Sequence, residues 1–223
     1  MSFNELNSVE HFIIHRLTGV NLNKVHSGSV VQEPITEYDT VQWKYLESDL
    51  LQREITDVLL EKELKESLCR LNPEIAAQPD RADEVIHKLR AILITVSNVG
   101  LVRANEEFSK WLRGEITLPF GKDYKHIPVK IIDFETLKNN SFIVTNQFKF
   151  RARETKIPDV VFFVNGIPLV IGEAKTPVRP AVSWLDGAHD IHVGYENTIP
   201  QMFVPNVFSF ATEGKELFIG AVR

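Results

Sequence analysis

Cysteine is almost absent from this 223-residue chain, in which Cys69 stands alone. A single thiol excludes an internal disulfide and a zinc knuckle, because both need more than one cysteine. The sequence also lacks an apolar run long enough to span a bilayer, since Asn165, Gly166 and Pro168 interrupt the longest one, residues 160–172. The N-terminus lacks the basic and apolar regions of a secretory signal. These absences favour a cytoplasmic protein without a membrane segment.

An excess of positive charge is missing too: 25 Lys and Arg residues face 30 Asp and Glu residues, for a formal net charge of −5. Phosphate backbones bind basic surfaces, so a role on DNA would require a local basic groove or a partner that holds the DNA. No Gly-x-x-x-x-Gly-Lys-Ser/Thr loop occurs, which excludes a P-loop ATPase within these residues. The 43% of hydrophobic residues suffice for one large core, or for a core with a smaller helical subdomain.

Hydrophobic periodicity predicts mainly helices in the first half of the chain and mainly strands in the second. Helical spacing covers residues 6–17, a long zone at 43–71, a helix from Asp80 to about Asn98, a short helix that ends near Leu112, and a mostly helical segment at 181–198. Strand patterns cover 129–134, 142–145, 160–175, 204–211 and 216–222. The sequence therefore predicts an α/β fold with a mixed central β-sheet flanked by helices.

Three segments follow from this order of elements. Residues 1–42 form the start of the core, with its first helix and an edge segment; residues 43–114 form a helical insertion; residues 115–223 complete the core and carry the hairpin described next. Because the chain stops at Arg223 directly after a strand, we expect an N-terminal fragment of a longer polypeptide.

Polar residues flank the two apolar strands of a predicted hairpin. Asp159 precedes the first strand, an Asn165-Gly166 turn follows it, and the second strand ends in Glu173-Ala174-Lys175. A two-residue turn would place Asp159 opposite Gly172 and would direct Glu173 to the other face of the sheet. A three-residue loop, or an equivalent bulge, would place Asp159 directly opposite Glu173. We predict this second register, in which both carboxylates and Lys175 share one face.

In that register Asp159 and Glu173 can share one Mg²⁺ or Mn²⁺ ion, with the backbone carbonyl of Ala174 as a further ligand. A divalent ion lowers the pKa of water and offsets charge on an attacked phosphate, and Lys175 can orient that water or neutralise the developing charge. The pattern alone is weak, because charged residues at strand ends are commonly just solvated. Charges at the ends of strands that are apolar on both sides favour the functional interpretation.

The run Pro158-Asp159-Val-Val-Phe-Phe-Val-Asn-Gly-Ile-Pro-Leu-Val-Ile-Gly-Glu173-Ala174-Lys175 resembles the nuclease motif of the restriction (R) subunit of type I restriction-modification enzymes. Residues 144–148 and 199–214 resemble segments on either side of that motif. The resemblance implies a PD-(D/E)xK restriction-endonuclease-like core, with catalytic and metal-binding roles for Asp159, Glu173 and Lys175. It implies double-stranded DNA as substrate and methyltransferase and specificity subunits as partners. ATP would act only through translocase domains that are missing here.

Two further residues take roles from the resemblance, and a third is a candidate from its position on the neighbouring strand. Glu10 matches an acid that such nucleases often carry on the first core helix, although an exposed helix carboxylate explains it equally well. Tyr195 matches the tyrosine of the family's Gln-x-x-x-Tyr motif, but Ile191 stands at the glutamine position, so packing alone could explain the tyrosine. Gln147 could reach substrate from the neighbouring strand, or serve that strand as a hydrogen-bonding residue.

The best basic cluster precedes Asp159 and contains Lys149, Arg151, Arg153 and Lys156. These side chains could guide DNA phosphate toward the metal, or could simply protect a solvated strand edge.

We therefore expect a Mg²⁺-dependent endonuclease domain that cleaves double-stranded DNA within a type I restriction-modification complex. Two alternatives stay open. The chain could be a docking module whose region 43–113 binds the methyltransferase core or the motor, with a vestigial nuclease centre. It could also be a stand-alone nuclease acting on branched or damaged DNA.

Overall fold

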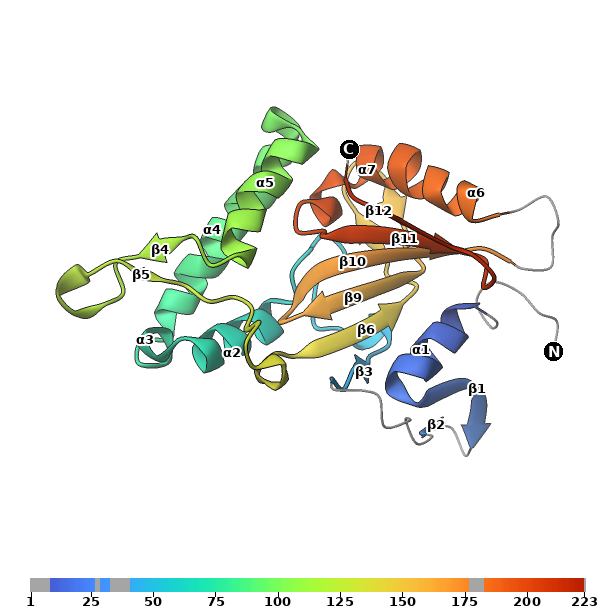
Figure 1. The fold of residues 1–223 in the computed structure, drawn as a ribbon, viewed down its shortest axis with the longest axis horizontal. Helices are drawn as coiled ribbons and strands as arrows, with labels where there is room; N and C mark the ends of the chain where they lie inside the picture. Colours follow the sequence, from blue (N-terminus) through green and yellow to red (C-terminus); the bar gives the residue numbers. More distant parts are fainter. Residues whose placement is uncertain (1–8, 27–28, 33–40, 177–182, 223) are drawn as a thin grey trace.

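The structure is a computed structural model that describes residues 9–26, 29–32, 41–176 and 183–222. Its centre is a mixed sheet of six strands in the order β12-β11-β10-β9-β6-β3 (Figure 1). Strand β11 runs parallel to β10, and β3 runs parallel to β6, while the other neighbours are antiparallel. The strands are β3 (Lys44–Tyr45), β6 (Phe142–Asn146), β9 (Val160–Val164), β10 (Ile167–Ala174), β11 (Phe208–Thr212) and β12 (Leu217–Gly220).

Helices flank this sheet, which confirms the predicted α/β class with a mixed central sheet. They are α1 (His11–Thr18), α2 (Glu61–Leu71), α3 (Pro73–Ala76), α4 (Asp80–Val99), α5 (Leu101–Leu112), α6 (Trp184–His189), the π-helix η5 (Asp190–Tyr195) and α7 (Glu196–Thr198). Figure 1 shows α2 to α5 beyond one end of the sheet strands, where β9 turns into β10, and α1 and α6 near the other end. Within the described residues, no helix is both long and apolar enough to cross a membrane.

The described residues also form several short elements. Three two-stranded ribbons pair β1 (Val20–His26) with β2 (Ser29–Gln32), β4 (Thr117–Leu118) with β5 (Ile127–Pro128), and β7 (Phe150–Arg151) with β8 (Thr155–Lys156). The 3₁₀ turns are η2 (Ser48–Leu50), η3 (Lys122–Tyr124), η4 (Leu137–Asn139) and η6 (Pro200–Phe203).

The two faces of the sheet carry different apolar clusters. Val161, Phe163 and Ile171 belong to a large core that extends to the helices α2, α4 and α5. The alternate residues, among them Val160 and Phe162, belong to a smaller cluster with Ile14 of α1. Side chains alternate between faces along a strand, so cluster membership shows on which face each strand residue lies.

Two predicted elements are wrong. In the zone 43–71 only residues 61–71 form an α-helix, while Lys44–Tyr45 pairs with β6, Ser48–Leu50 forms a single 3₁₀ turn and residues 51–60 are irregular. The leucines of that zone fall at helical spacing, but tertiary packing decides the backbone of its first half. Residues 129–134 form no strand either. The segment boundaries at 42/43 and 114/115 stay a prediction, although β3 ties residues 44–45 to the central sheet.

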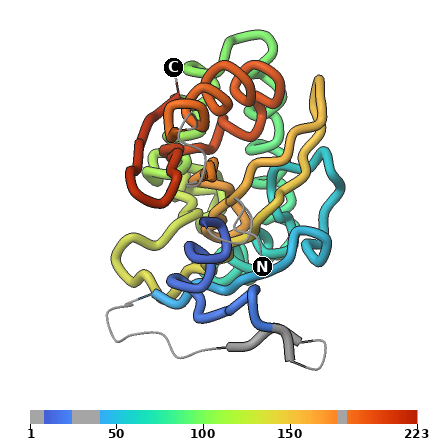
Figure 2. The backbone as a smooth tube through the Cα atoms, turned by 90° about the vertical axis from the view of Figure 1, so that its right-hand side faces the viewer, coloured from blue at the N-terminus to red at the C-terminus, as the bar shows by residue number. Residues whose placement is uncertain are grey.

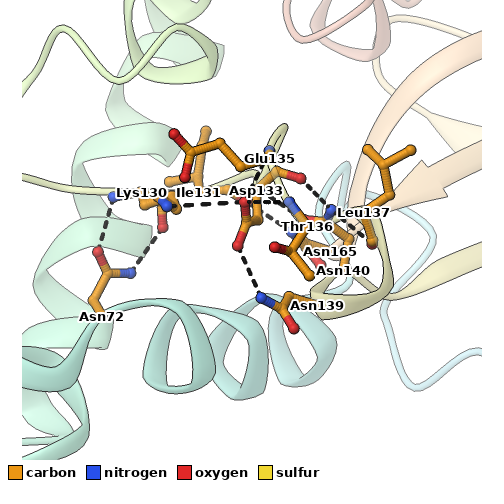
Figure 3. A network of polar contacts seen from close by, with 10 residues as sticks. All are labelled: Asn72, Lys130, Ile131, Asp133, Glu135, Thr136, Leu137, Asn139, Asn140 and Asn165. Carbon is orange, nitrogen blue, oxygen red and sulfur yellow. Dashed lines mark hydrogen bonds and ion pairs between the residues drawn. The ribbon is translucent and has the colours of Figure 1, made fainter.

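Side-chain amides take the place of a strand partner along residues 129–134 (Figure 3). The Nδ2 atom of Asn165 donates to Ile131 O at 2.8 Å and to Asn140 Oδ1 at 2.8 Å. Asn140 in turn accepts from Asp133 N at 2.8 Å, and Asn72 bonds both backbone groups of Lys130. This network joins α2, the irregular segment and the β9–β10 turn into one unit.

The turn between β9 and β10 has two residues, so the predicted register arises from a bulge, the second of the two forms that we predicted, and not from a three-residue loop. Asn165 and Gly166 both have positive φ, at 53° and 79°, as a type I′ turn requires. Val164 therefore pairs with Ile167 and Phe163 with Pro168. The register then shifts at Leu169, so that Phe162 pairs with Val170 and Val160 with Gly172. The bulge beside Pro168 supplies the extra residue that we expected in the loop.

Gly166 is required at this turn for two reasons. Its φ of 79° disfavours any side chain, and its backbone lies against the start of α2, where Leu60 N donates to Gly166 O at 2.8 Å. A Cβ atom here would lie 2.9 Å from Leu64 N and closer still to Leu60 O. Both neighbours are backbone atoms, so neither can move aside as a side chain can.

We predict that Gly166→Ala destabilises the chain by about 3 kcal/mol, from a left-handed strain of about 1 kcal/mol and an overpacking cost of about 2 kcal/mol. Gly114→Ala is the matched control, because Gly114 also has positive φ (69°) but no atom within 4 Å of its Cβ position. It should show only the strain. Urea unfolding measures both, and equal losses for the two variants would contradict the proposed contact with α2.

Candidate active site

The bulge at Leu169 brings the two acidic residues of the hairpin together. The ladder ends with Gly172 paired to Val160, and the same register, continued by one residue, places Glu173 opposite Asp159. Glu173 shares the face of Ile171, and Asp159 that of Val161, so both carboxylates lie on the side of the large core. Asp159 Oδ2 accepts a hydrogen bond from the backbone N–H of Ala174 at 2.8 Å. The predicted register is therefore present, and the bulge that we named as the equivalent of a longer loop produces it.

Glu173 is buried, with 4% of its surface exposed, and both of its oxygens have partners. Lys175 Nζ lies 2.9 Å from Glu173 Oε1. The Tyr195 hydroxyl donates to Glu173 Oε2 at 3.0 Å. Tyr195 thus contacts the predicted catalytic carboxylate and is more than the packing residue that sequence reasoning preferred.

Asp190 is the site residue that sequence reasoning missed. Its Oδ2 lies 2.7 Å from Lys175 Nζ, so the ammonium group sits between two carboxylates. Asp190 opens the π-helix that ends at Tyr195. Periodicity analysis assumes 3.6 residues per turn and could not place Asp190 beside Tyr195.

Helix α6 covers this group closely because Gly187 has no side chain. A Cβ at Gly187 would lie 3.4 Å from Glu173 Cγ and 3.1 Å from Ala211 Cβ. Ser183 begins α6 with a capping box: its hydroxyl accepts from Leu185 N, and Asp186 accepts from Ser183 N at 2.9 Å. The capped helix thus packs closely on Glu173 and helps to bury it.

Glu10 approaches from the other side of the sheet. It is 1% exposed, which corrects the alternative of a solvated helix carboxylate. Asn146 Nδ2 donates to it at 3.2 Å, and Gln147 Nε2 donates to its two oxygens at 3.0 and 3.1 Å. Gln147 has φ 51° directly after β6, and the same Nε2 lies 3.3 Å from Asp159 Oδ1. Gln147 therefore links Glu10 to the hairpin, while its contact with substrate stays a prediction.

The basic cluster lies on the ribbon β7–β8 and its flanks, which Figure 2 shows in yellow-orange extending away from the central sheet. Lys149, Arg151 and Arg153 are exposed. Lys156 is half-buried and pairs with Glu154 at 2.9 Å. The nearby aromatic residues Phe148 and Phe150 are buried, so they fill the core.

Burial raises the pKa of Glu173 to about 8, and the charge of Asp159 adds to this rise, while Lys175 and Tyr195 oppose it. Burial also raises the pKa of Tyr195, and the charges of Glu173 and Asp159 raise it further. Burial by itself would lower the pKa of Lys175, but the hydrogen bonds to Asp190 and Glu173 outweigh it and leave that pKa raised. Tyr195 therefore stays a donor and Lys175 stays charged at neutral pH.

Two carboxylates that repel each other suit a shared cation. In the described part of the chain, no three or more His, Cys, Asp or Glu side chains lie close enough together to hold a metal ion by themselves. Mg²⁺, however, often takes only one or two protein carboxylates and completes its shell with water and substrate oxygens. Asp159 and Glu173 fit that requirement, because the charge of one already raises the pKa of the other. Ala174 O and Glu10 stay predicted ligands.

We predict that Glu173→Gln stabilises the metal-free chain, and does so more at pH 8 than at pH 5. The unfolded carboxyl loses its proton near pH 4.5 and the folded one near pH 8, so the free energy of unfolding falls as pH rises through this window. Glutamine removes that loss, and each recovered 1 kcal/mol should raise the unfolding midpoint by about 2–4 °C. Thermal unfolding in EDTA measures it, with the exposed Glu84→Gln as control. A gain that does not depend on pH would contradict the assignment.

Comparison with known proteins relates this chain to type I restriction enzymes. A family model described as "Type I restriction enzyme R protein N terminus" matches residues 31–223. The "Type I restriction enzyme HindI endonuclease subunit" of Haemophilus influenzae is 27% identical over 211 residues, which are 89% of this chain and 19% of that protein. The "Putative type I restriction enzyme MjaIXP endonuclease subunit" of Methanocaldococcus jannaschii is 26% identical over 171 residues, 74% of this chain and 16% of that protein.

This chain thus spans less than a fifth of these two relatives. The family model, in contrast, covers all but the first 30 residues, including the hairpin and the π-helix. The chain belongs to the family of type I restriction enzyme R protein N-terminal regions.

Proposed function

We propose that this chain is the nuclease module of a type I restriction R subunit, with a PD-(D/E)xK core that hydrolyses phosphodiester bonds of double-stranded DNA. One observation carries the proposal: Lys175 contacts Glu173, and Asp159 accepts a hydrogen bond from the backbone N–H of Ala174 between them, in a chain of this family. Two acids and one ammonium at a single point are the groups that metal-assisted phosphodiester hydrolysis needs.

Each residue has a distinct task in this proposal. Asp159 and Glu173 hold a Mg²⁺ ion, for which Mn²⁺ can substitute, and the carbonyl of Ala174 adds a backbone ligand. A bound ion supplies Lewis-acid stabilisation and lowers the pKa of water. Lys175 keeps its proton and neutralises negative charge that develops on the phosphate. Tyr195 fixes the second oxygen of Glu173 by its hydrogen bond of 3.0 Å.

The partners in this proposal compensate for the acidity of the chain. A net charge of −5 disfavours DNA binding by this chain alone, so methyltransferase and specificity subunits would hold the duplex near the site. ATP would act through translocase domains outside these residues, which span only 19% of the HindI subunit. The exposed cations Arg151 and Arg153 would contact phosphate locally, together with Lys156.

A docking role remains the second candidate, and exposed apolar residues favour it. Ile94, Val99 and Val102 lie exposed on α4 and α5, within the region 43–113. Such residues commonly mark contact surfaces. One chain can both dock to a partner and cleave DNA. The docking candidate excludes the nuclease function only if the site around Asp159 and Glu173 no longer binds a metal ion. Calorimetric titration of Mg²⁺ or Mn²⁺ separates the two cases: binding that Glu173→Gln abolishes supports the nuclease, and its absence in the unaltered chain supports docking alone.

We predict that Asp159→Ala or Lys175→Ala abolishes DNA cleavage by the assembled restriction complex while ATP hydrolysis continues. The first change removes a metal ligand and the second removes the fixed positive charge, whereas neither touches a motor domain. Loss of at least a hundredfold is expected, since one charge-stabilising group contributes about 10²–10³ in rate. The matched controls are Asp83→Ala and Lys88→Ala on α4, whose exposed side chains pair away from the hairpin. Unchanged cutting by either site variant would refute the assignment.

We predict that Arg151→Ala together with Arg153→Ala weakens duplex binding by this chain and flattens its salt dependence. Each lost phosphate contact should reduce the slope of log K against log salt by about 0.9. Fluorescence anisotropy at several salt concentrations measures the slope. Lys122→Ala with Lys125→Ala removes the same charge from the loop between β4 and β5 and is the control. Equal effects of the two pairs would show that only bulk charge matters.

A further inference from the structure

The π-helix η5 places Asp190, and not Ile191, at the candidate site. Ile191 stands four residues before Tyr195, where the resemblance predicts a glutamine, but it is 1% exposed and packed into the large core. Asp190 stands five residues before Tyr195 and contacts Lys175 at 2.7 Å. The side chain that reaches the site is thus shifted by one position along the helix.

The backbone explains this shift. Residues five apart on an α-helix differ in direction by about 140°, because each residue turns about 100°. A π-helix closes i→i+5 hydrogen bonds, so residues five apart lie nearly above one another. Within η5 the N–H of Glu196 donates to Ile191 O, which is such an i→i+5 bond. Asp190 and Tyr195 therefore face the same side, and each contacts a different member of the Glu173–Lys175 pair.

We propose that Asp190 is a positioning residue that holds Lys175 away from full engagement with Glu173. This inference rests on the proposed nuclease function. Lys175 Nζ has two carboxylate partners, at 2.9 Å in Glu173 and 2.7 Å in Asp190. With Asp190 present, the ammonium group shares its charge between them and leaves Glu173 available to a divalent ion. Without Asp190, the ammonium group has Glu173 as its remaining partner in this cluster and competes with the ion for it.

A purely structural role for Asp190 would predict a loss of folding stability, whereas the positioning role predicts almost none. The side chain of Asp190 is 46% exposed and that of Lys175 14%, so water screens the pair from the side of Asp190 and limits its contribution to the free energy of unfolding. Removing the carboxylate should therefore leave the thermal unfolding midpoint almost unchanged. The effect of losing Asp190 should instead appear in Mg²⁺ binding at Glu173, and it should depend on Lys175.

The test is a double-mutant cycle read out by calorimetric titration of Mg²⁺ into the chain. Asp190→Asn should weaken Mg²⁺ binding about fivefold, within the range by which contacting residues couple. Asp190→Glu should restore most of the affinity, because it keeps the charge and the ion pair. In a Lys175→Met background, Asp190→Asn should change the affinity less than twofold, since the ammonium group through which Asp190 acts is gone. Asp83→Asn, an exposed acid on α4 paired with Lys65, controls for net charge.

Equal weakening by Asp190→Asn with and without Lys175 would overturn the proposal, because it would show that the charge of Asp190 acts on the ion directly. No weakening with Lys175 present would overturn it as well. In the assembled enzyme, Asp190→Asn should lower kcat about tenfold with KM for DNA changed less than twofold, as expected when orientation and not substrate binding is lost.

The cleavage assay separates this inference from the function on which it rests. If Asp159→Ala abolishes cleavage and Asp190→Asn behaves as the unaltered protein, only the positioning role fails. If Asp159→Ala also cuts normally, or if the unaltered chain binds no Mg²⁺, the nuclease assignment fails and takes the positioning role with it.

Discussion

The buried amide of Asn165 sets the geometry on which the hairpin depends. Asn165 is fully buried, holds a left-handed turn, and bonds Ser141, Ile131 and Asn140 through its backbone and side chain. The turn fixes which residue of β9 faces which residue of β10, and the bulge at Leu169 then changes that pairing by one. Side chains alternate with a period of two, so one step decides whether Asp159 and Glu173 share a face. The chemistry at one end of the hairpin thus depends on hydrogen bonds at the other.

Electrostatics at the hairpin end that carries Glu173 oppose folding, while hydrogen bonds at the turn support it. Burial and the neighbouring Asp159 raise the pKa of Glu173 to about 8, so the charged form is disfavoured in the folded chain. Lys175 and Tyr195 offset part of this cost through hydrogen bonds of 2.9 and 3.0 Å. A buried acid beside a half-buried acid is typical of a site arranged for a ligand, because desolvated charged groups cluster at functional positions.

Sequence reasoning succeeded where local chemistry dominates and failed where tertiary structure does. The strands of the hairpin, their register and the helix end near Asn98 follow from alternation, turn residues and breakers. The helix over 43–71 was wrong because helical leucine spacing also suits an irregular segment packed on a core. The strand predicted over residues 129–134 was wrong because amide side chains form hydrogen bonds with the backbone there, and strand propensity does not predict such bonds. The burial of Glu10 depends on contacts 136 and 137 residues away in the chain.

The contrast between local chemistry and tertiary structure also explains why the whole run from Asp159 to Lys175 is a more specific signal than its three charged residues alone. A bare Asp…Glu-x-Lys pattern requires only that charges follow strands, which many sheets satisfy. Here the intervening Asn165-Gly166 must also fit against α2, where Leu60 N donates to Gly166 O at 2.8 Å, and Pro168 must adjoin a bulge. The run from Asp159 to Lys175 thus meets two demands, one from the turn and one from the site. A π-helix then supplies Asp190 and Tyr195, which no α-helical spacing could bring together.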